Sequence, residues 1–198
     1  MTQKNFKRVE HWDNVFMQEF SKESDRASVI LAVAMLDQAL ETLLKTYLVP
    51  TDSSEDRLLD GAYAPLSSFS ARIDLCYRLS LISARFCRDL HIIRRIRNEF
   101  AHNVTGCNFG SSGVRNRIIE LMRSSRIDEQ FPEFREQYAD GAKGDFQMNV
   151  SWMLWQLWSL AEHSSPLEAR SIESFYVFEN NDEDKGETGD TVLKENEN

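Results

Sequence analysis

The segment from Asp25 to Leu48 constrains the fold more than any other part of this sequence. It contains neither Gly nor Pro, Ser24 is placed to cap its start, and Pro50 follows its end. Its first half is apolar on all sides. Polarity returns only on the face of Asp37, Gln38, Glu41, Thr42 and Lys45. A helix that is apolar all round is typical of the centre of a bundle, so the sequence predicts a helical bundle built around this segment.

Several other segments repeat apolar residues at steps of three and four, as one face of a helix does. The predicted helices cover residues 5–20, 65–81, 83–101, 114–124 and 144–163. Only eight Gly and four Pro occur in 198 residues, which disfavours many short strands joined by tight turns. The predicted fold class is therefore all-α, a single helical bundle of about five to six helices, with residues 125–143 irregular.

The net charge of −9 is concentrated near the C-terminal end of the chain. Residues 179–198 hold eight acidic and two basic side chains, so they contribute −6 and leave −3 for the rest. Few hydrophobic residues occur there, and such a composition cannot bury a core. We expect one helical domain over residues 1–178 and a disordered acidic tail over residues 179–198. An acidic chain lacks the basic footprint of proteins that bind DNA by charge, so direct DNA binding is not expected.

The cysteines and the N-terminal residues bear on cellular location. Cys76, Cys87 and Cys107 are odd in number and form no Cys-x-x-Cys pair, which fits a reducing compartment. The first residues hold no apolar signal core, and the longest apolar stretch, residues 27–36, is too short to cross a bilayer. We expect a cytoplasmic protein with no membrane span.

The usual catalytic and metal-binding motifs are absent from the sequence. The glycine-rich segment at residues 105–113 lacks the lysine and hydroxyl pair of a phosphate-binding loop, and it follows no predicted strand. No nucleophile elbow is present. His11, His91, His102 and His163 are scattered without Cys or carboxylate partners at zinc-ligand spacing. We expect no metal site and no cofactor.

Arginines are concentrated on two of the predicted helices. They are Arg85, Arg88, Arg94, Arg95 and Arg97 on the first, and Arg115, Arg117, Arg123 and Arg126 on or just after the second. If the two helix faces converge, these groups form an anion site. The alternative is that they are solvated charges on helix surfaces.

Arg97 is the arginine whose position most needs an explanation, because its spacing places it on the apolar stripe of its helix. A guanidinium there needs hydrogen-bonding partners or a solvent-filled cleft. The structural interpretation pairs it with a carboxylate, for which the candidates are Asp37, Glu41 and Asp74. The functional interpretation places it in a cleft beside Asn98 and His102.

His102 is predicted to lie at the end of the same helix. A histidine there can interact with the last carbonyl groups and with the negative end of the helix dipole. It can also transfer a proton near neutral pH while a neighbouring arginine stabilises a phosphate, which is what metal-independent RNA cleavage requires. The sequence leaves both roles open.

The segments Pro65–Ser83 and Asp89–His102 resemble the signature region of the mannitol operon repressor family. This resemblance covers the middle of the chain, and the character of the Asp25–Leu48 helix agrees with it. It implies an all-helical transcriptional regulator that has no recognised DNA-binding motif. Such a regulator would act through a partner protein, whose identity the sequence does not give.

The run from Arg97 to His102 is also similar to the arginine, polar residue, spacer and histidine motif of the HEPN superfamily. That resemblance implies a metal-independent ribonuclease or toxin working as a two-fold dimer. Arg97 would hold phosphate, Asn98 would position it, and His102 would act as acid or base. Two functions thus remain, a non-enzymatic repressor-type module, which we favour, and a ribonuclease with RNA as substrate. A homodimer is expected under either.

Overall fold

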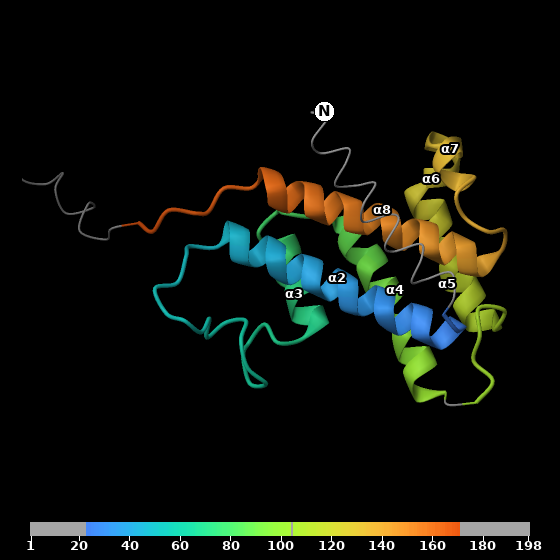
Figure 1. Ribbon diagram of the computed structural model, residues 1–198, viewed down its shortest axis with the longest axis horizontal. Coiled ribbons are helices and arrows are strands. Elements are labelled where there is room, and N and C mark those ends of the chain that lie inside the picture. Colours follow the sequence, from blue (N-terminus) through green and yellow to red (C-terminus); the bar gives the residue numbers. More distant parts are fainter. Residues whose placement is uncertain (1–22, 104, 171–198) are drawn as a thin grey trace, which may run out of the picture. The chain divides into compact units, whose positions relative to one another are not determined.

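The computed structural model describes residues 23–103 and 105–170, and all regular structure in these ranges is helical (Figure 1). The helices are α2 (Asp25–Tyr47), α3 (Phe69–Arg78), α4 (Ala84–His102), α5 (Ser112–Ser125), α6 (Ile127–Gln130), α7 (Pro132–Arg135) and α8 (Ala142–His163). The prediction of an all-α fold is confirmed. The predicted helix at 5–20, the domain boundary at 178 and the acidic tail at 179–198 lie outside the described residues.

Helix α2 occupies the centre of the bundle, as predicted. The Ser24 hydroxyl accepts a hydrogen bond from the Ala27 amide at 3.3 Å and so caps its start. The helix packs against α3, α4 and α8, and in Figure 1 it runs alongside α8 and crosses in front of α3 and α4. Leu36, Leu40 and Leu43 on it are fully buried. The apolar surface seen in the sequence is therefore used for packing on several sides.

The length of α2 corrects the expectation that no segment of the chain is long and apolar enough to cross a bilayer. With a mean hydropathy of 1.6 over its apolar window, this helix is long and apolar enough to cross a membrane, although residues 27–36 alone are too short. Half of that window is buried inside the structure, in contact with other helices. A core helix passes the same test of length and composition, and the packing of α2 is that of a core helix.

Helices α3 and α4 form a pair that covers one side of α2. Helix α3 begins later than predicted, because residues 64–67 form a turn in which the Ser67 amide donates to the Ala64 carbonyl at 3.0 Å. Its cap is Ser68. Ser83 caps α4 as predicted, accepting a hydrogen bond from the Phe86 amide at 3.2 Å.

The prediction that residues 125–143 are irregular was wrong, because the four-residue helices α6 and α7 lie there. Pro132 begins α7, and Phe131 between the two helices has non-helical torsions. Ile127, Tyr138 and Met148 form a small second core, packed against Phe131, Phe134 and Trp152. This core accounts for part of the aromatic surface on α8, with the Phe131 and Trp152 ring centroids 4.7 Å apart.

The glycine-rich segment between α4 and α5 is a structural loop. Phe109 is buried there, with its ring centroid 5.5 Å from that of Phe100 and 5.4 Å from that of Phe146. The Phe109 amide donates to the Asp25 carboxylate at 3.2 Å. The segment thus joins the ends of α2, α4 and α8, as expected of a loop without a phosphate-binding motif.

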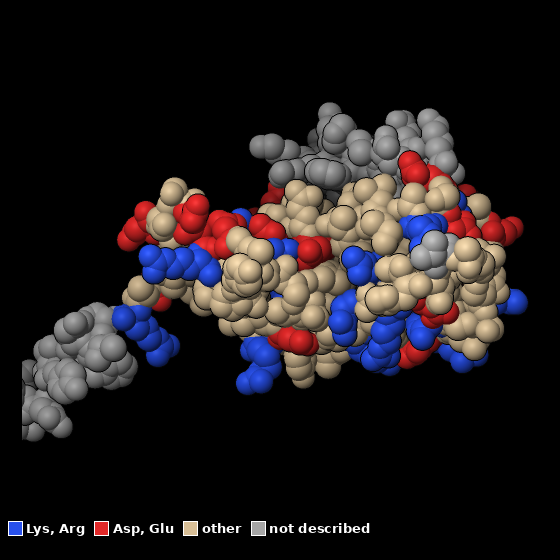
Figure 2. Space-filling model, turned by 90° about the horizontal axis from the view of Figure 1, so that it is seen from below, with Lys and Arg blue, Asp and Glu red and all other residues tan. Residues whose placement is uncertain are grey.

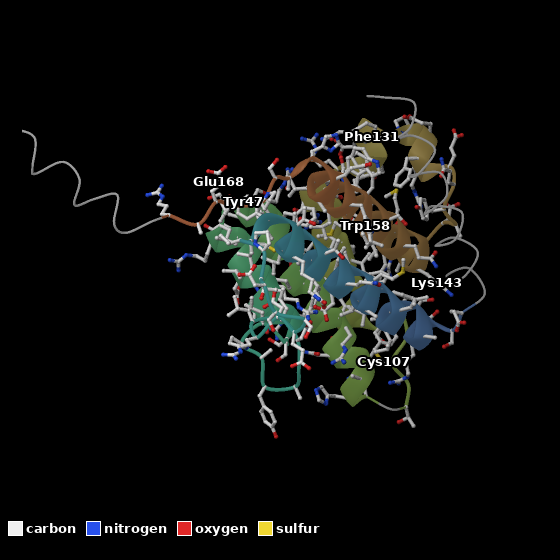
Figure 3. All side chains as sticks on the ribbon, turned by 60° about the vertical axis from the view of Figure 1, so that its left-hand side comes forward. Tyr47, Cys107, Phe131, Lys143, Trp158 and Glu168 are labelled. Atoms are coloured by element: carbon white, nitrogen blue, oxygen red, sulfur yellow. The ribbon has the colours of Figure 1, made fainter. Side chains whose placement is uncertain are left out.

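Helix α8 packs against α2 and α5. Gly144 in its first turn has no room for a side chain, because an added Cβ would lie 1.7 Å from the Ala139 carbonyl oxygen. Lys143 beside it donates to the Glu23 carbonyl at 2.7 Å, which ties the start of α8 to the start of α2 (Figure 3).

Candidate functional site

Arg97, Asn98 and His102 lie in the last turns of α4, on the surface of the protein. Arg97 and His102 are exposed and Asn98 is half-buried. The Arg97 guanidinium donates to the Asn98 side-chain oxygen at 3.2 Å. The buried face of α4 is formed by Leu90, Ile92, Ile93, Ile96 and Phe100. Arg97 lies at the edge of this face and is exposed, so the buried ion pair of the structural interpretation is not formed by Arg97.

The buried ion pair that was predicted for Arg97 is made by Arg72 of α3. Arg72 is 7% exposed, and its two terminal nitrogens each lie 2.8 Å from a carboxylate oxygen, one of Asp37 and one of Glu41. Its Nε donates to the Leu66 carbonyl at 2.9 Å. Asp37 and Glu41, considered as partners of Arg97, thus pair with Arg72 instead. Arg72 lies at helical spacing from Phe69 and Cys76, and the argument applied to Arg97 would have found it.

Lys45 extends this network towards solvent. Its ammonium lies 2.9 Å from Glu41 and 3.1 Å from Asp60. The hydrogen bond to Glu41, followed by that to Asp60, raises the pKa of Lys45 above its usual value. The pKa of Asp60 is lowered by the Asp56 backbone amide and then by Lys45. This network holds α2, α3 and the intervening loop together and is structural.

Asp74, the third predicted partner of Arg97, instead faces His91 of α4. The ring nitrogen Nε2 of His91 lies 3.0 Å from the Asp74 carboxylate. Cys87 lies one turn before His91, and the three potential ligand atoms lie within 4.8 Å of one another. Burial, followed by the Asp74 charge, raises the pKa of the Cys87 thiol. The histidines were described as having no Cys at zinc-ligand spacing, but Cys87 and His91 lie four residues apart in the sequence.

Arg26, at the start of α2, caps the end of α4. Its guanidinium donates to the Phe100 carbonyl, and at 2.6 Å to the Asn103 carbonyl. A cation at this position also interacts favourably with the negative end of the helix dipole. The role considered for His102 in the structural interpretation is thus filled by Arg26. The His102 side chain makes no hydrogen bond or ion pair with the described residues.

Two polar contacts tie α4 to α5, one between Glu99 and Arg117 and one between Asp89 and Ser124. Glu99 of α4 pairs with Arg117 of α5. The buried Asp89 carboxylate accepts a hydrogen bond from the Ser124 hydroxyl at 2.5 Å and another from Arg88 at 3.0 Å. Three of the arginines counted in the sequence therefore have carboxylate partners: Arg88 with Asp89, Arg117 with Glu99, and Arg126 with Glu129.

Other arginines of the two helices are exposed and, within residues 23–103 and 105–170, have no carboxylate partner. These are Arg85, Arg95 and Arg97 of α4 and Arg115 and Arg123 of α5, and we call the exposed sides of the two helices that carry them the basic α4/α5 surface. Figure 2 shows the molecule from below. Lys and Arg side chains gather on the right-hand half of this view, the half in which Figure 1 labels α4 and α5. A local excess of positive charge on an acidic chain can attract an anionic partner.

Two solved structures share the arrangement of these helices. A chain of the MtlR–HPr complex from Escherichia coli matches with a TM-score of 0.53 at 19% identity, over 74% of this chain and 98% of that chain. YggD from Shigella flexneri, described as a possible transcriptional regulator, matches with a TM-score of 0.53 at 14% identity, over 75% of this chain and 95% of that chain. This chain has their fold. No family model matches the sequence, and neither does any curated protein.

The likeness to MtlR confirms the fold that the sequence resemblance implied. The match spans nearly the whole of both solved chains, so the bundle seen here corresponds to a complete folded unit in each. At these identities the likeness concerns the fold, and function must be argued from this chain's own surface.

Proposed function

We propose that this chain is a non-enzymatic regulatory module that acts by docking a partner protein on the basic α4/α5 surface. The observation that carries the proposal is the set of five exposed arginines without carboxylate partners among the described residues. Unpaired guanidinium groups contribute little to the stability of a bundle but bind carboxylates and phosphates well. They are the groups expected at an interface with an acidic protein face.

The two related structures support a regulatory role. One was solved as a complex of two proteins, MtlR and HPr, and the other is described as a possible transcriptional regulator. The net charge of −9 disfavours direct DNA binding, because a phosphate backbone attracts basic proteins. HPr from the source organism is therefore the first partner to test.

The test is a calorimetric titration of HPr into the purified protein at two salt concentrations. Arg95→Glu combined with Arg97→Glu should weaken binding at least about tenfold, because the two residues project from different sides of α4 and an attractive contact on either side becomes repulsive. Arg57→Glu makes a matched control, since Arg57 is also exposed but lies in the loop between α2 and α3. Equal binding by the double variant and by the control would reject this surface as the docking site.

The second candidate function is a metal-independent ribonuclease, favoured by one observation. Arg97, Asn98 and His102 all lie in the accessible last turns of α4, and the His102 imidazole is not engaged by any described residue. A free imidazole beside a guanidinium is suited to proton transfer next to a phosphate. The HEPN resemblance of this run supports the same roles for the three residues.

RNA cleavage in the presence of a chelator tests the ribonuclease. His102→Ala should abolish cleavage, and His163→Ala should not, because His163 is likewise the last residue of a long helix but bonds to the Ser159 carbonyl. Cleavage that is lost only in His102→Ala would replace the regulatory proposal. Absence of cleavage in the wild-type protein leaves the docking module as the better account.

We further propose a symmetric homodimer. Two-fold dimers are the commonest oligomers of soluble proteins, and the HEPN resemblance implies one. Sedimentation at tens of micromolar should show twice the monomer mass, since a standard interface with sub-micromolar affinity is occupied there. A monomer at that concentration would contradict the proposal.

A further inference from the structure

The side chains of Asp74, Cys87 and His91 converge on the outer side of the α3–α4 contact. Asp74 is contributed by α3, and Cys87 and His91 by successive turns of α4. Residues four apart on a helix project from the same face, so the Cys87 thiol and the His91 imidazole lie next to each other. Neither the docking surface nor the ribonuclease motif uses these three residues.

The three groups lie at distances close to those of a metal site. In tetrahedral zinc sites the metal–ligand distances are about 2.0–2.3 Å, which places ligand atoms roughly 3.3–3.8 Å from one another. Here all three ligand atoms lie within 4.8 Å of one another, and His91 Nε2 is 3.0 Å from the Asp74 oxygen. Side-chain movements of about 1 Å would bring the three ligand atoms to the spacing of a zinc site.

We propose that Asp74, Cys87 and His91 bind a zinc ion that links α3 to α4. Sulfur, imidazole nitrogen and carboxylate oxygen together suit zinc better than magnesium or calcium, which prefer oxygen ligands throughout. A thiolate and a carboxylate balance the charge of the ion. On binding, the Cys87 S–H bond breaks, a sulfur–zinc bond forms, and the proton passes to solvent. His91 Nε2, which donates its hydrogen to Asp74 in the metal-free protein, also gives up that hydrogen, so that the neutral ring carries its proton on Nδ1 and binds zinc through Nε2.

The fourth coordination position faces solvent. The Asp74 side chain is 65% exposed and that of His91 is 21% exposed, so the three protein ligands lie on one side of the ion. Closed structural zinc sites have four protein ligands, whereas a site with three leaves one position for water or another small ligand. Water fills that position in the isolated protein.

Zinc binding should stabilise the bundle, because the ligands come from two helices that separate on unfolding. An ion that binds only the folded state raises its stability by mass action. The melting temperature of the full-length protein should therefore rise with added zinc, whether or not the protein binds HPr or cleaves RNA. This separates the zinc proposal from the proposed function.

The experiment titrates the full chain with zinc, and in parallel with cobalt as a spectroscopic probe. One equivalent should bind, and the cobalt complex should show a sulfur-to-metal charge-transfer band. Cys87→Ser should remove that band, and Asp74→Asn should weaken zinc binding by at least about tenfold. Cys107→Ser is the matched control, since Cys107 is also half-buried but belongs to no group of three potential ligands among the described residues.

If Cys87→Ser does not fold, Asp74→Asn still tests the zinc site, because an exposed amide in place of a carboxylate leaves the packing of the helices intact. Failure of the wild-type protein to bind one equivalent of zinc would overturn the proposal. So would a cobalt complex without a sulfur band, or equal binding by Asp74→Asn and the wild type. In those cases the three residues form only an inter-helix hydrogen bond beside a packed thiol.

Discussion

Asp37 of α2 and Arg72 of α3 form a hydrogen-bonded ion pair across two packed helices, with 2.8 Å between Oδ1 and Nη1. Arg72 is almost fully buried, whereas the Asp37 side chain remains 28% exposed. Glu41, one turn further along α2, forms an ion pair with the second terminal nitrogen of the Arg72 guanidinium. The pair fixes the register between the two helices, because α3 cannot slide along α2 without separating both contacts.

Arg72→Ala should lower the free energy of unfolding by about 3 kcal/mol, which urea unfolding can measure. The substitution leaves two carboxylates without their common cation and opens a buried space. Their partial exposure keeps the cost at the lower end of the range for buried pairs.

Arg97→Ala is the control for that measurement. Because Arg97 is exposed and bonds only to the neighbouring Asn98, its removal should change stability by less than about 0.5 kcal/mol. A larger loss for Arg97→Ala than for Arg72→Ala would contradict the assignment of the buried pair.

Ser124→Ala tests the polar contact between α4 and α5. The substitution removes one of the hydrogen bonds to the buried Asp89 carboxylate, and we expect a loss of about 1–3 kcal/mol in unfolding free energy. Ser125→Ala is the neighbouring control, since the Ser125 hydroxyl lies 3.5 Å from the Met122 carbonyl of its own helix. Thermal melting of both variants should separate them, and equal melting temperatures would show that the Asp89 contact contributes nothing.

Arg26→Ala should loosen the end of α4. The two carbonyl groups that accept from Arg26 lose their donor, so the amides in the last turn should exchange with deuterium faster than in the wild type. The expected loss in stability is about 1–2 kcal/mol. Arg115→Ala removes an exposed arginine at the start of α5 and should leave exchange in α4 unchanged. Similar exchange in both variants would argue against this cap.

Much of the fold could be predicted because its signals are local. The capping serines at residues 24 and 83 precede their helices in sequence, and the apolar character of α2 is visible without knowledge of its neighbours. Helices α6 and α7 could not be predicted, because four residues are too few for a periodic pattern.

The site residues were harder to predict, because burial depends on which helix lies opposite. Arg72 and Arg97 both occupy positions at apolar helical spacing, but only Arg72 faces two carboxylates of α2. Arg97 lies on an exposed side of α4, although Ile96 and Phe100 on either side of it in sequence are buried. The spacing of Cys87 and His91 was visible in the sequence, whereas Asp74 joins them only through the packing of α3 on α4.

Cys76 should make the stability of the bundle fall in alkaline solution. Burial raises the pKa of this thiol from 9.0 to about 12, so the folded protein keeps the proton while the unfolded chain releases it. Between these two pKa values the unfolded state binds fewer protons, and the Cys76 contribution to the free energy of unfolding should fall by about 1.4 kcal/mol per pH unit. Below pH 9 the contribution should be constant.

Urea unfolding of the wild type and of Cys76→Ala between pH 8 and 11, roughly the range that spans the unfolded pKa, isolates this contribution from other titrating groups. The variant should be less stable at pH 8 because of the small cavity, and the difference should shrink as pH rises. Cys107→Ala makes the matched control, since Cys107 is only half-buried and its stability difference should depend much less on pH. Parallel pH profiles for the wild type and Cys76→Ala would show that the Cys76 thiol ionises as easily in the folded bundle as in the unfolded chain.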